Sequence, residues 1–318
     1  MVSNRRLLII SSVIFFALAA SGCQKTKVEA FEQFKSTSES ISSTSSKIYE
    51  NSNEWRADSK VLNLLIAADD QRNGLAIDED TAKELRALRT PNEYNEWVKG
   101  IEDGHLKAIK DYNSLLSSYA AALHLLSTGV AEEKTIQDQV NAINSNGRKV
   151  KNGIDKLLNK TPANSFFPKG LAIFSTAFEV YVKEHFKEEG RDVLKKVIPK
   201  NQSIINEYAD KGKRLAVLIQ LKVNAEYTSL LGDYFKVISR EKSYELRLAL
   251  LERVRSLHGS YTSHMKSLKD MEKVYEKLPQ VHTNLALAFE DAAFNRRTLR
   301  EFEQLGKGIG KRFNELKK

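Results

Sequence analysis

One cysteine and six histidines are the side chains of this 318-residue chain with the most specific chemistry. A thiol can act as a nucleophile, a metal ligand or a disulfide partner, but Cys23 has no second cysteine to pair with inside the chain. None of the histidines has an H-E-x-x-H or other metal-ligand spacing, and the sequence contains no G-x-S-x-G, Walker A, G-x-G-x-x-G or EF-hand motif. The sequence therefore predicts no metal, no cofactor and no catalytic residues. The histidines are His105, His124, His185, His258, His264 and His282.

The position of Cys23 is more informative than its chemistry. Arg5 and Arg6 precede an uncharged run, LLIISSVIFFALAA, at residues 7–20. As a helix this run would be roughly 21 Å long, which is short for a hydrocarbon core of about 30 Å. A positive start, a short apolar centre and small residues before a cleavage point are typical of a secretory signal peptide.

The triplet Ala-Ser-Gly at 20–22, followed by Cys23, resembles the lipobox of bacterial lipoprotein signal peptides. The resemblance covers residues 1–23 and does not extend to the remaining chain. It implies cleavage before Cys23, a diacylglycerol thioether on its sulfur and further acylation, for example with palmitate. Gln24 stands where an aspartate retains enterobacterial lipoproteins in the inner membrane, which implies the outer membrane. An ordinary signal peptide with a chance cysteine and an uncleaved anchor helix are the alternatives.

The composition favours an all-α protein with a diffuse positive charge. Prolines number five, and no N-G or D-G pair lies between alternating strands. The net charge of +9 is spread along the chain, which is typical of a solvated surface and also suits anionic lipid headgroups. We expect no nucleic-acid partner, because the chain is predicted to be exported and has no nucleic-acid-binding motif.

The serine-rich segment at 36–46 looks like a linker, since nine of its 11 residues are Ser or Thr. Its spacing predicts a helix instead, because large apolar residues recur every seven positions and serines recur every seven between them. A serine in such a row lets a partner backbone approach, and its hydroxyl can bond to the preceding turn. A linker with chance apolar residues is the alternative. The two sets are Phe34, Ile41, Ile48, Trp55 and Leu62, and Ser38, Ser45, Ser52 and Ser59.

Similar rows predict further long helices. One begins at Thr90 and Pro91 and stops at Gly129, and a second occupies 136–157, so that the two form an antiparallel hairpin. Pro199 and Pro279 are predicted as helix boundaries, with another break near Gly232 or Ser239. The last two rows are Tyr244, Leu248, Leu251 and onward to Leu278, and Leu285 to Leu316 with small residues at Ala292 and Gly306.

These rows predict an all-α fold, an elongated antiparallel bundle of five to seven long helices with coiled-coil-like packing. The expected organisation is a cleaved signal peptide at 1–22, a lipidated Cys23 with a short tether to residue 30, and a single bundle domain at 31–318. Residues 166–182 stand out because 11 of the 17 are apolar. Such a helix is either the centre of the bundle or contacts something apolar outside it. Its candidate contact residues are Phe166, Phe167, Leu171, Phe174 and Phe178.

Two functions fit these features. The first is a lipid-anchored interaction or scaffold protein of the bacterial cell envelope, without catalytic activity, that contacts a protein partner in the periplasm or at the surface. The second is a membrane-active protein, which would resemble the α-helical pore-forming toxins and use residues 166–182. A helical sensor domain is a third idea, but no transmembrane helix follows to carry a signal inward.

Overall fold

The computed structural model of the chain contains seven helices and no strands among the residues that it describes. Its backbone is described for residues 4–76, 78–87, 104–129, 133–158, 190–288 and 295–315, and its side chains for 28–76, 78–83, 107–129, 134–150, 192–288, 295–312 and 314. The prediction of an all-α helical bundle is confirmed. The helices are α1 (Asn4–Arg72), α2 (Glu79–Ala87), α4 (Gly104–Thr128), α5 (Glu133–Leu158), α7 (Gly190–Arg240), α8 (Tyr244–Leu287) and α9 (Arg296–Glu315).

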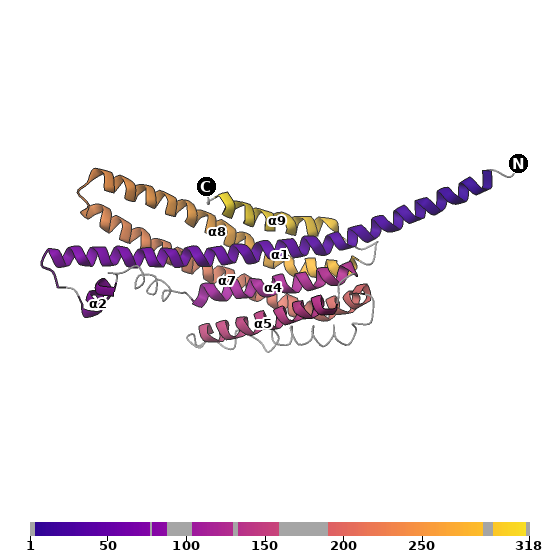
Figure 1. Cartoon of the computed structure of the whole chain (residues 1–318), viewed down its shortest axis with the longest axis horizontal. Helices are drawn as coiled ribbons and strands as arrows, with labels where there is room; N and C mark the ends of the chain where they lie inside the picture. Colours follow the sequence, from indigo (N-terminus) through magenta and orange to yellow (C-terminus); the bar gives the residue numbers. More distant parts are fainter. Residues whose placement is uncertain are drawn as a thin grey trace.

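The bundle is elongated and is organised around α1, which packs against α4, α7 and α9 (Figure 1). Helices α4 and α5 form one antiparallel hairpin, and α7 and α8 form a longer one. The N-terminal part of α1 projects beyond the other helices, and the turn between α7 and α8 lies at the opposite end (Figure 1). The long axis of the molecule therefore runs from the projecting N-terminal part of α1 to the end of the α7–α8 hairpin.

The alternating row on α1 is confirmed, because the large residues from Phe34 to Leu62 and three of the four serines are buried. The hydroxyls of Ser38 and Ser45 donate to the carbonyls of Phe34 and Ile41, at 2.9 and 2.8 Å. Ser38 and Ser45 thus satisfy their hydroxyls on the preceding turn and take little room in the core. The serine-rich stretch is part of the longest helix of the bundle and is not a linker.

Small residues bring α9 close to α1, as the spacing predicted for Gly306. A Cβ on Gly306 would lie 2.6 Å from Thr37 Cγ2 and 3.1 Å from Thr37 Cα. The ring of Phe34 packs on Phe302 one turn away, with centroids 5.8 Å apart. Glycine is required at this contact because any side chain would push the two helix backbones apart.

Polar pairs attach the α7–α8 hairpin to α1. Arg56 Nε lies 2.9 Å from Glu226 Oε1, and Arg240 Nη1 lies 2.6 Å from Asp70 Oδ1. Between these pairs Ser59 donates to the buried carboxylate of Asp233 at 2.6 Å. Residue numbers rise together in these contacts, so α1 and α7 run in the same direction.

Two predicted helix boundaries are wrong. Pro199 and Pro279 both lie inside helices, in α7 and α8. Proline removes one backbone hydrogen bond within a helix, but buried neighbours on the same turns, Ile198 and Leu278 among them, hold each helix in place. The last helix consequently begins only at Arg296, where the Asn295 side chain accepts hydrogen bonds from the backbone N–H groups of Arg297 and Thr298.

Other predicted boundaries are confirmed. Gly129 follows α4 with a φ of +66°, which is a conformation that favours glycine. The break expected near Ser239 occurs at residues 241–243, where Ser243 caps α8 by accepting from the Leu246 N–H, whereas Gly232 lies inside α7. The predicted start at Thr90 and Pro91 lies outside the described residues. Backbone residues 24–30, expected to form a tether, continue α1 in the uncleaved chain.

Candidate functional surface

The site residues proposed from the sequence lie at or beyond the edge of what the structure describes. Cys23 belongs to the described backbone of α1, but its side chain is not described. Phe166, Phe167, Leu171, Phe174 and Phe178 lie outside the described residues. Among helices whose side chains are described, none has a stretch long and apolar enough to span a membrane.

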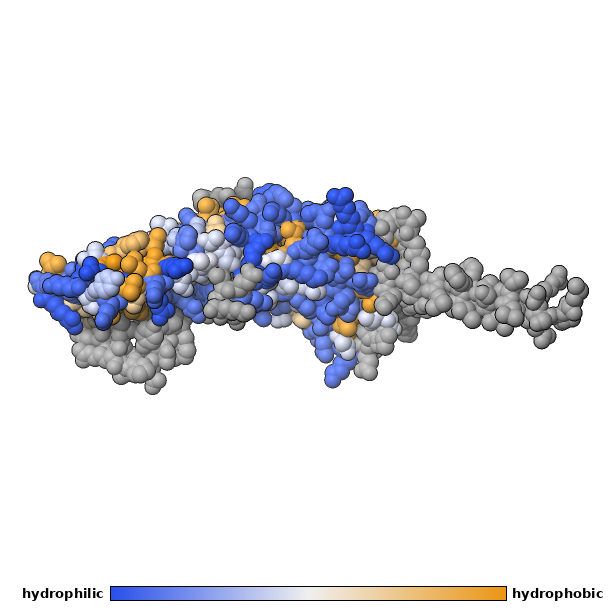
Figure 2. Space-filling model, turned by 90° about the horizontal axis from the view of Figure 1, so that it is seen from above, coloured by the Kyte–Doolittle hydropathy of each residue, from blue (hydrophilic) through white to orange (hydrophobic). Residues whose placement is uncertain are grey.

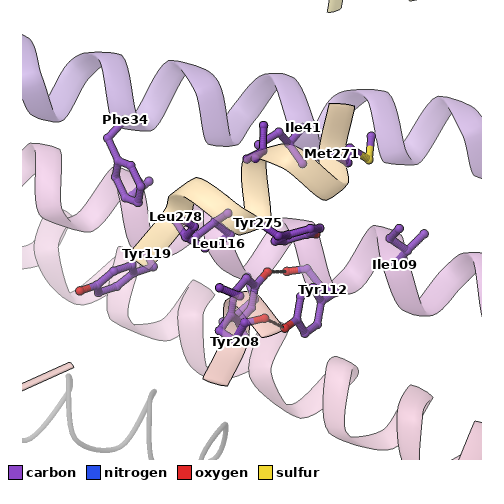
Figure 3. Packing of buried hydrophobic residues seen from close by; sticks show 14 of the residues in the cluster. Phe34, Ile41, Ile109, Tyr112, Leu116, Tyr119, Tyr208, Met271, Tyr275 and Leu278 are labelled. Carbon is purple, nitrogen blue, oxygen red and sulfur yellow. Dashed lines mark hydrogen bonds between the residues drawn. The ribbon is translucent and has the colours of Figure 1, made fainter. Parts of the chain in front are cut away.

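A tyrosine pair lies at the centre of the bundle, between α4 and α7 (Figure 3). The rings of Tyr112 and Tyr208 stack with centroids 4.1 Å apart and planes 9° apart. Each phenol donates to the backbone carbonyl of the other residue. Burial raises the pKa of both phenols well above the usual value, so both keep the proton that they donate.

A second polar chain crosses three helices beside this pair. Tyr275 on α8 donates to the Asn113 side-chain oxygen on α4, and the Asn113 amide donates to the Ser45 hydroxyl on α1. Gly212 on α7 makes room for the ring, because a Cβ there would lie 2.4 Å from Tyr275 Cε1. All three hydrogen-bonding residues are buried. The chain fixes the register of α1, α4 and α8 and is not open to a substrate.

His282 is buried where α4, α7 and α8 meet, and its neighbours determine its tautomer. The Gln202 amide nitrogen donates to the Pro279 carbonyl at 3.1 Å, so the Gln202 oxygen points to His282 Nδ1, 2.8 Å away. Nδ1 therefore carries the proton, and Nε2 accepts from the Tyr119 hydroxyl at 2.8 Å. Burial lowers the pKa of His282 to about 3, so the ring is neutral near pH 7.

The remaining described histidines also have structural partners. His264 is buried against Trp55, with ring centroids 4.9 Å apart, and burial lowers its pKa to about 4. His124 contacts Glu32 at 2.7 Å, and Tyr227 contacts the His258 ring at 2.8 Å. Within the described part of the chain, no three His, Cys, Asp or Glu side chains are arranged to hold a metal ion. The buried His264 and His282 rings act in packing and hydrogen bonding between helices.

The first turns of α8 expose large apolar side chains at the end of the α7–α8 hairpin. Tyr244 is 74% exposed, and Leu246, Leu248 and Leu251 are between 46% and 55% exposed. We call these four residues the hairpin-end surface. Figure 2 shows hydrophobic residues gathered near this end of the molecule, within a mostly hydrophilic surface. The exposed residues Glu245, Arg247 and Arg253 lie among them.

Sequence spacing did not identify this surface. The spacing predicts that Tyr244, Leu248 and Leu251 belong to the row that continues to Leu278, but the first turns of that row point to solvent. The row becomes buried only near Leu268, where α8 lies inside the bundle. Helical spacing shows which residues share a face, but it does not show whether another element covers that face.

No protein-family model, curated protein or solved structure matches this chain.

Proposed function

We propose that this protein is a lipid-anchored interaction protein of the bacterial cell envelope. The lipid on Cys23 holds it to the membrane, and the hairpin-end surface binds an envelope protein. The observation that carries the proposal is the group of four exposed apolar side chains at the end of the bundle opposite the projecting N-terminal part of α1.

The anchor follows from residues 1–23 and from the physics of acyl chains. Each buried methylene contributes about 0.8 kcal/mol, so two or three chains on Cys23 hold a protein at a membrane almost permanently. Gln24 after the cysteine favours the outer membrane. Because α1 continues from Cys23 into the buried row at Phe34, the anchor is joined directly to the core of the bundle.

The hairpin-end surface has the character of a protein contact. Tyr244, Leu248 and Leu251 share one face of α8 at spacings of four and three residues. Large apolar side chains with charged residues beside them are typical of interaction sites. Apolar and charged residues alternate on the exposed first turn, where Leu246 lies between Glu245 and Arg247. Ser243 caps this helix, so the surface is presented on a regular helix.

Replacing the cysteine tests the anchor. Cys23→Ser removes the only thiol, so we expect loss of labelled palmitate and release of the protein from the membrane fraction. Gln24→Asn serves as the matched control and should keep both properties. A Cys23→Ser protein that stays membrane-bound at unchanged mass would show that the anchor is not the cysteine.

Site-specific photocrosslinking in cells tests the partner. A photoreactive residue at Leu248 should capture one envelope protein in a fixed ratio, and Leu251→Asp should abolish the capture by placing a charge in the apolar contact. The same probe at Ser256, an exposed position further along α8, is the control and should capture much less. Equal capture at both positions would contradict the assigned surface.

Vesicle leakage tests the membrane-active function predicted for residues 166–182. The interaction function predicts that the protein leaves dye-loaded vesicles intact. Leakage that disappears in Phe174→Asp would support the membrane-active function instead.

A further inference from the structure

Helix α7 carries a second apolar row that faces away from the bundle. Six residues follow one another at spacings of 3, 4, 3, 4 and 3, and all six are exposed. The opposite face of α7 is buried, as Ile219, Val223 and Leu230 show. We call the exposed residues the outward row. They are Leu218, Leu221, Ala225, Thr228, Gly232 and Phe235.

The spacing of the outward row indicates that its partner is another α-helix. Alternating steps of three and four are the a and d positions of a heptad, which keep one face directed at a neighbouring helix. Leu218, Leu221 and Phe235 are 53%, 64% and 50% exposed, so the large members of the row are at least half open to solvent. A surface helix normally has one apolar face, and α7 has two.

The small residues of the row complete an apolar surface. Thr228 donates its hydroxyl to the Asn224 carbonyl at 2.8 Å, so its polar group is satisfied within α7. A Cβ on Gly232 would meet nothing within 4 Å. Gly232 therefore leaves an open position between the larger side chains at Leu221 and Phe235.

We propose that the outward row binds the outward row of a second copy of this chain, with the two α7 helices antiparallel. Reversing the row about its midpoint, between residues 226 and 227, matches residues of complementary size. Leu218 then faces Phe235 of the second copy, and Leu221 faces the open position at Gly232 of the second copy. Ala225 faces Thr228 of the second copy, so the two backbones approach closely near the two-fold axis.

Size decides between the antiparallel arrangement and a parallel one. A parallel pair in register would place Phe235 against Phe235 and Gly232 against Gly232 in adjacent layers. The phenylalanines would hold the helices apart and leave a void at the glycines, which well-packed interfaces avoid. In the antiparallel pair, Phe235 packs on the smaller Leu218 of the second copy. Leu221 fills the space beside Gly232 of the second copy, so no void remains there.

Charges beside the row distinguish pairing with a second copy from binding to an acidic surface. Lys222 and Lys236 lie on the same flank of the outward row, and Lys236 is 3.1 Å from the Asp233 carboxylate on its own helix. An antiparallel pair brings this flank against the same flank of the second copy. Because Lys236 is paired with Asp233, the apolar pairing of the two rows should depend little on ionic strength. Binding of the lysines to an acidic partner or to anionic lipid would weaken as salt is added.

Cysteine pairing between two differently tagged full-length copies tests the geometry. Ala225→Cys in one copy and Thr228→Cys in the other should give a disulfide-linked pair on mild oxidation. Each variant expressed alone should link far less, because the same residue of the second copy is displaced along the helix. The wild-type chain controls for Cys23. Efficient linking of each single variant to itself would indicate a parallel pair and overturn the proposal.

Gly232→Leu tests the open position in full-length protein purified in detergent. Its Cβ would meet nothing within 4 Å in the protomer, and the leucine side chain would occupy the volume needed by Leu221 of the second copy. We expect the dissociation constant, measured by sedimentation, to rise by about tenfold or more. Ser256→Leu, which adds the same side chain at an exposed position on α8, should leave it unchanged.

Two results of this experiment would overturn the proposal. One is a wild-type protein that sediments as a monomer with bound detergent and lipid at every concentration. The other is a dimer that Gly232→Leu and Phe235→Asp both leave intact. Vesicle binding by a monomer, abolished by Phe235→Asp, would assign the outward row to a lipid surface.

Discussion

Replacing His282 by glutamine should change how the stability of the protein depends on pH. In the folded protein burial lowers the His282 pKa to about 3, whereas an unfolded histidine titrates near 6.5. Between these values the unfolded chain binds about one more proton than the folded protein. Stability is therefore fully present above about pH 6.5 and decreases as the pH falls toward 3.

The linkage gives the size of the effect. One proton of difference changes the free energy of unfolding by about 1.4 kcal/mol per pH unit. From pH 7 to pH 5, His282 alone should remove about 2 kcal/mol. His264, whose pKa burial lowers to about 4, should remove a similar amount over the same interval. The protein should thus lose stability well before most carboxylates are protonated.

The change in the free energy of unfolding per pH unit can be measured by urea unfolding, monitored by circular dichroism at half-unit steps between pH 5 and 7.5. His282→Gln keeps a polar group beside Tyr119 and Gln202 but cannot titrate, so the slope at pH 5–6 should fall by about 1.4 kcal/mol per pH unit. Ser256→Gln, a substitution at an exposed position on the same helix, is the control and should leave the slope as in the wild type. Equal slopes for wild type and His282→Gln would refute the neutral, buried assignment of His282.

Two further substitutions test the packing of the bundle. Gly306→Ala should destabilise the protein by about 1–3 kcal/mol, because its Cβ would press on the Thr37 backbone. Gly308→Ala, whose Cβ would meet only the Arg312 side chain at 3.4 Å, should be neutral or stabilising, since alanine favours a helix, and thermal unfolding distinguishes the two. Asn113→Leu should cost about 1–3 kcal/mol, because it leaves the buried Tyr275 hydroxyl without its acceptor. In urea unfolding, Tyr275→Phe should then cost much less in the Asn113→Leu background than in the wild type, and additive costs would argue against the hydrogen bond.

Local spacing predicted the helices where a single face was buried along its whole length. The row from Phe34 to Leu62 is such a case, because every large member is buried. Spacing also predicted the close approach at Gly306, since a small residue in a packed row leaves room for a neighbouring backbone. These features depend on residues within a few turns of one another, which is the range over which sequence periodicity carries information.

Features that depend on distant segments were not predicted. Pro199 and Pro279 have the local character of helix breakers, but tertiary packing on both sides keeps α7 and α8 continuous. The hydrogen bonds from Tyr275 through Asn113 to Ser45 join three helices, and no local sequence pattern predicts them. The outward row on α7 has heptad spacing, but only the position of the other helices shows that it is uncovered.

The common direction of α1 and α7 has a mechanical consequence. Contacts from Arg56–Glu226 to Arg240–Asp70 join the two helices side by side along the far half of α1. A pull on the N-terminal end of α1, resisted at the hairpin end, loads these contacts in shear. Under shear, the contacts between α1 and α7 must break together, whereas a peeling force would break them one after another. The bundle should therefore transmit tension from one end to the other without opening its core.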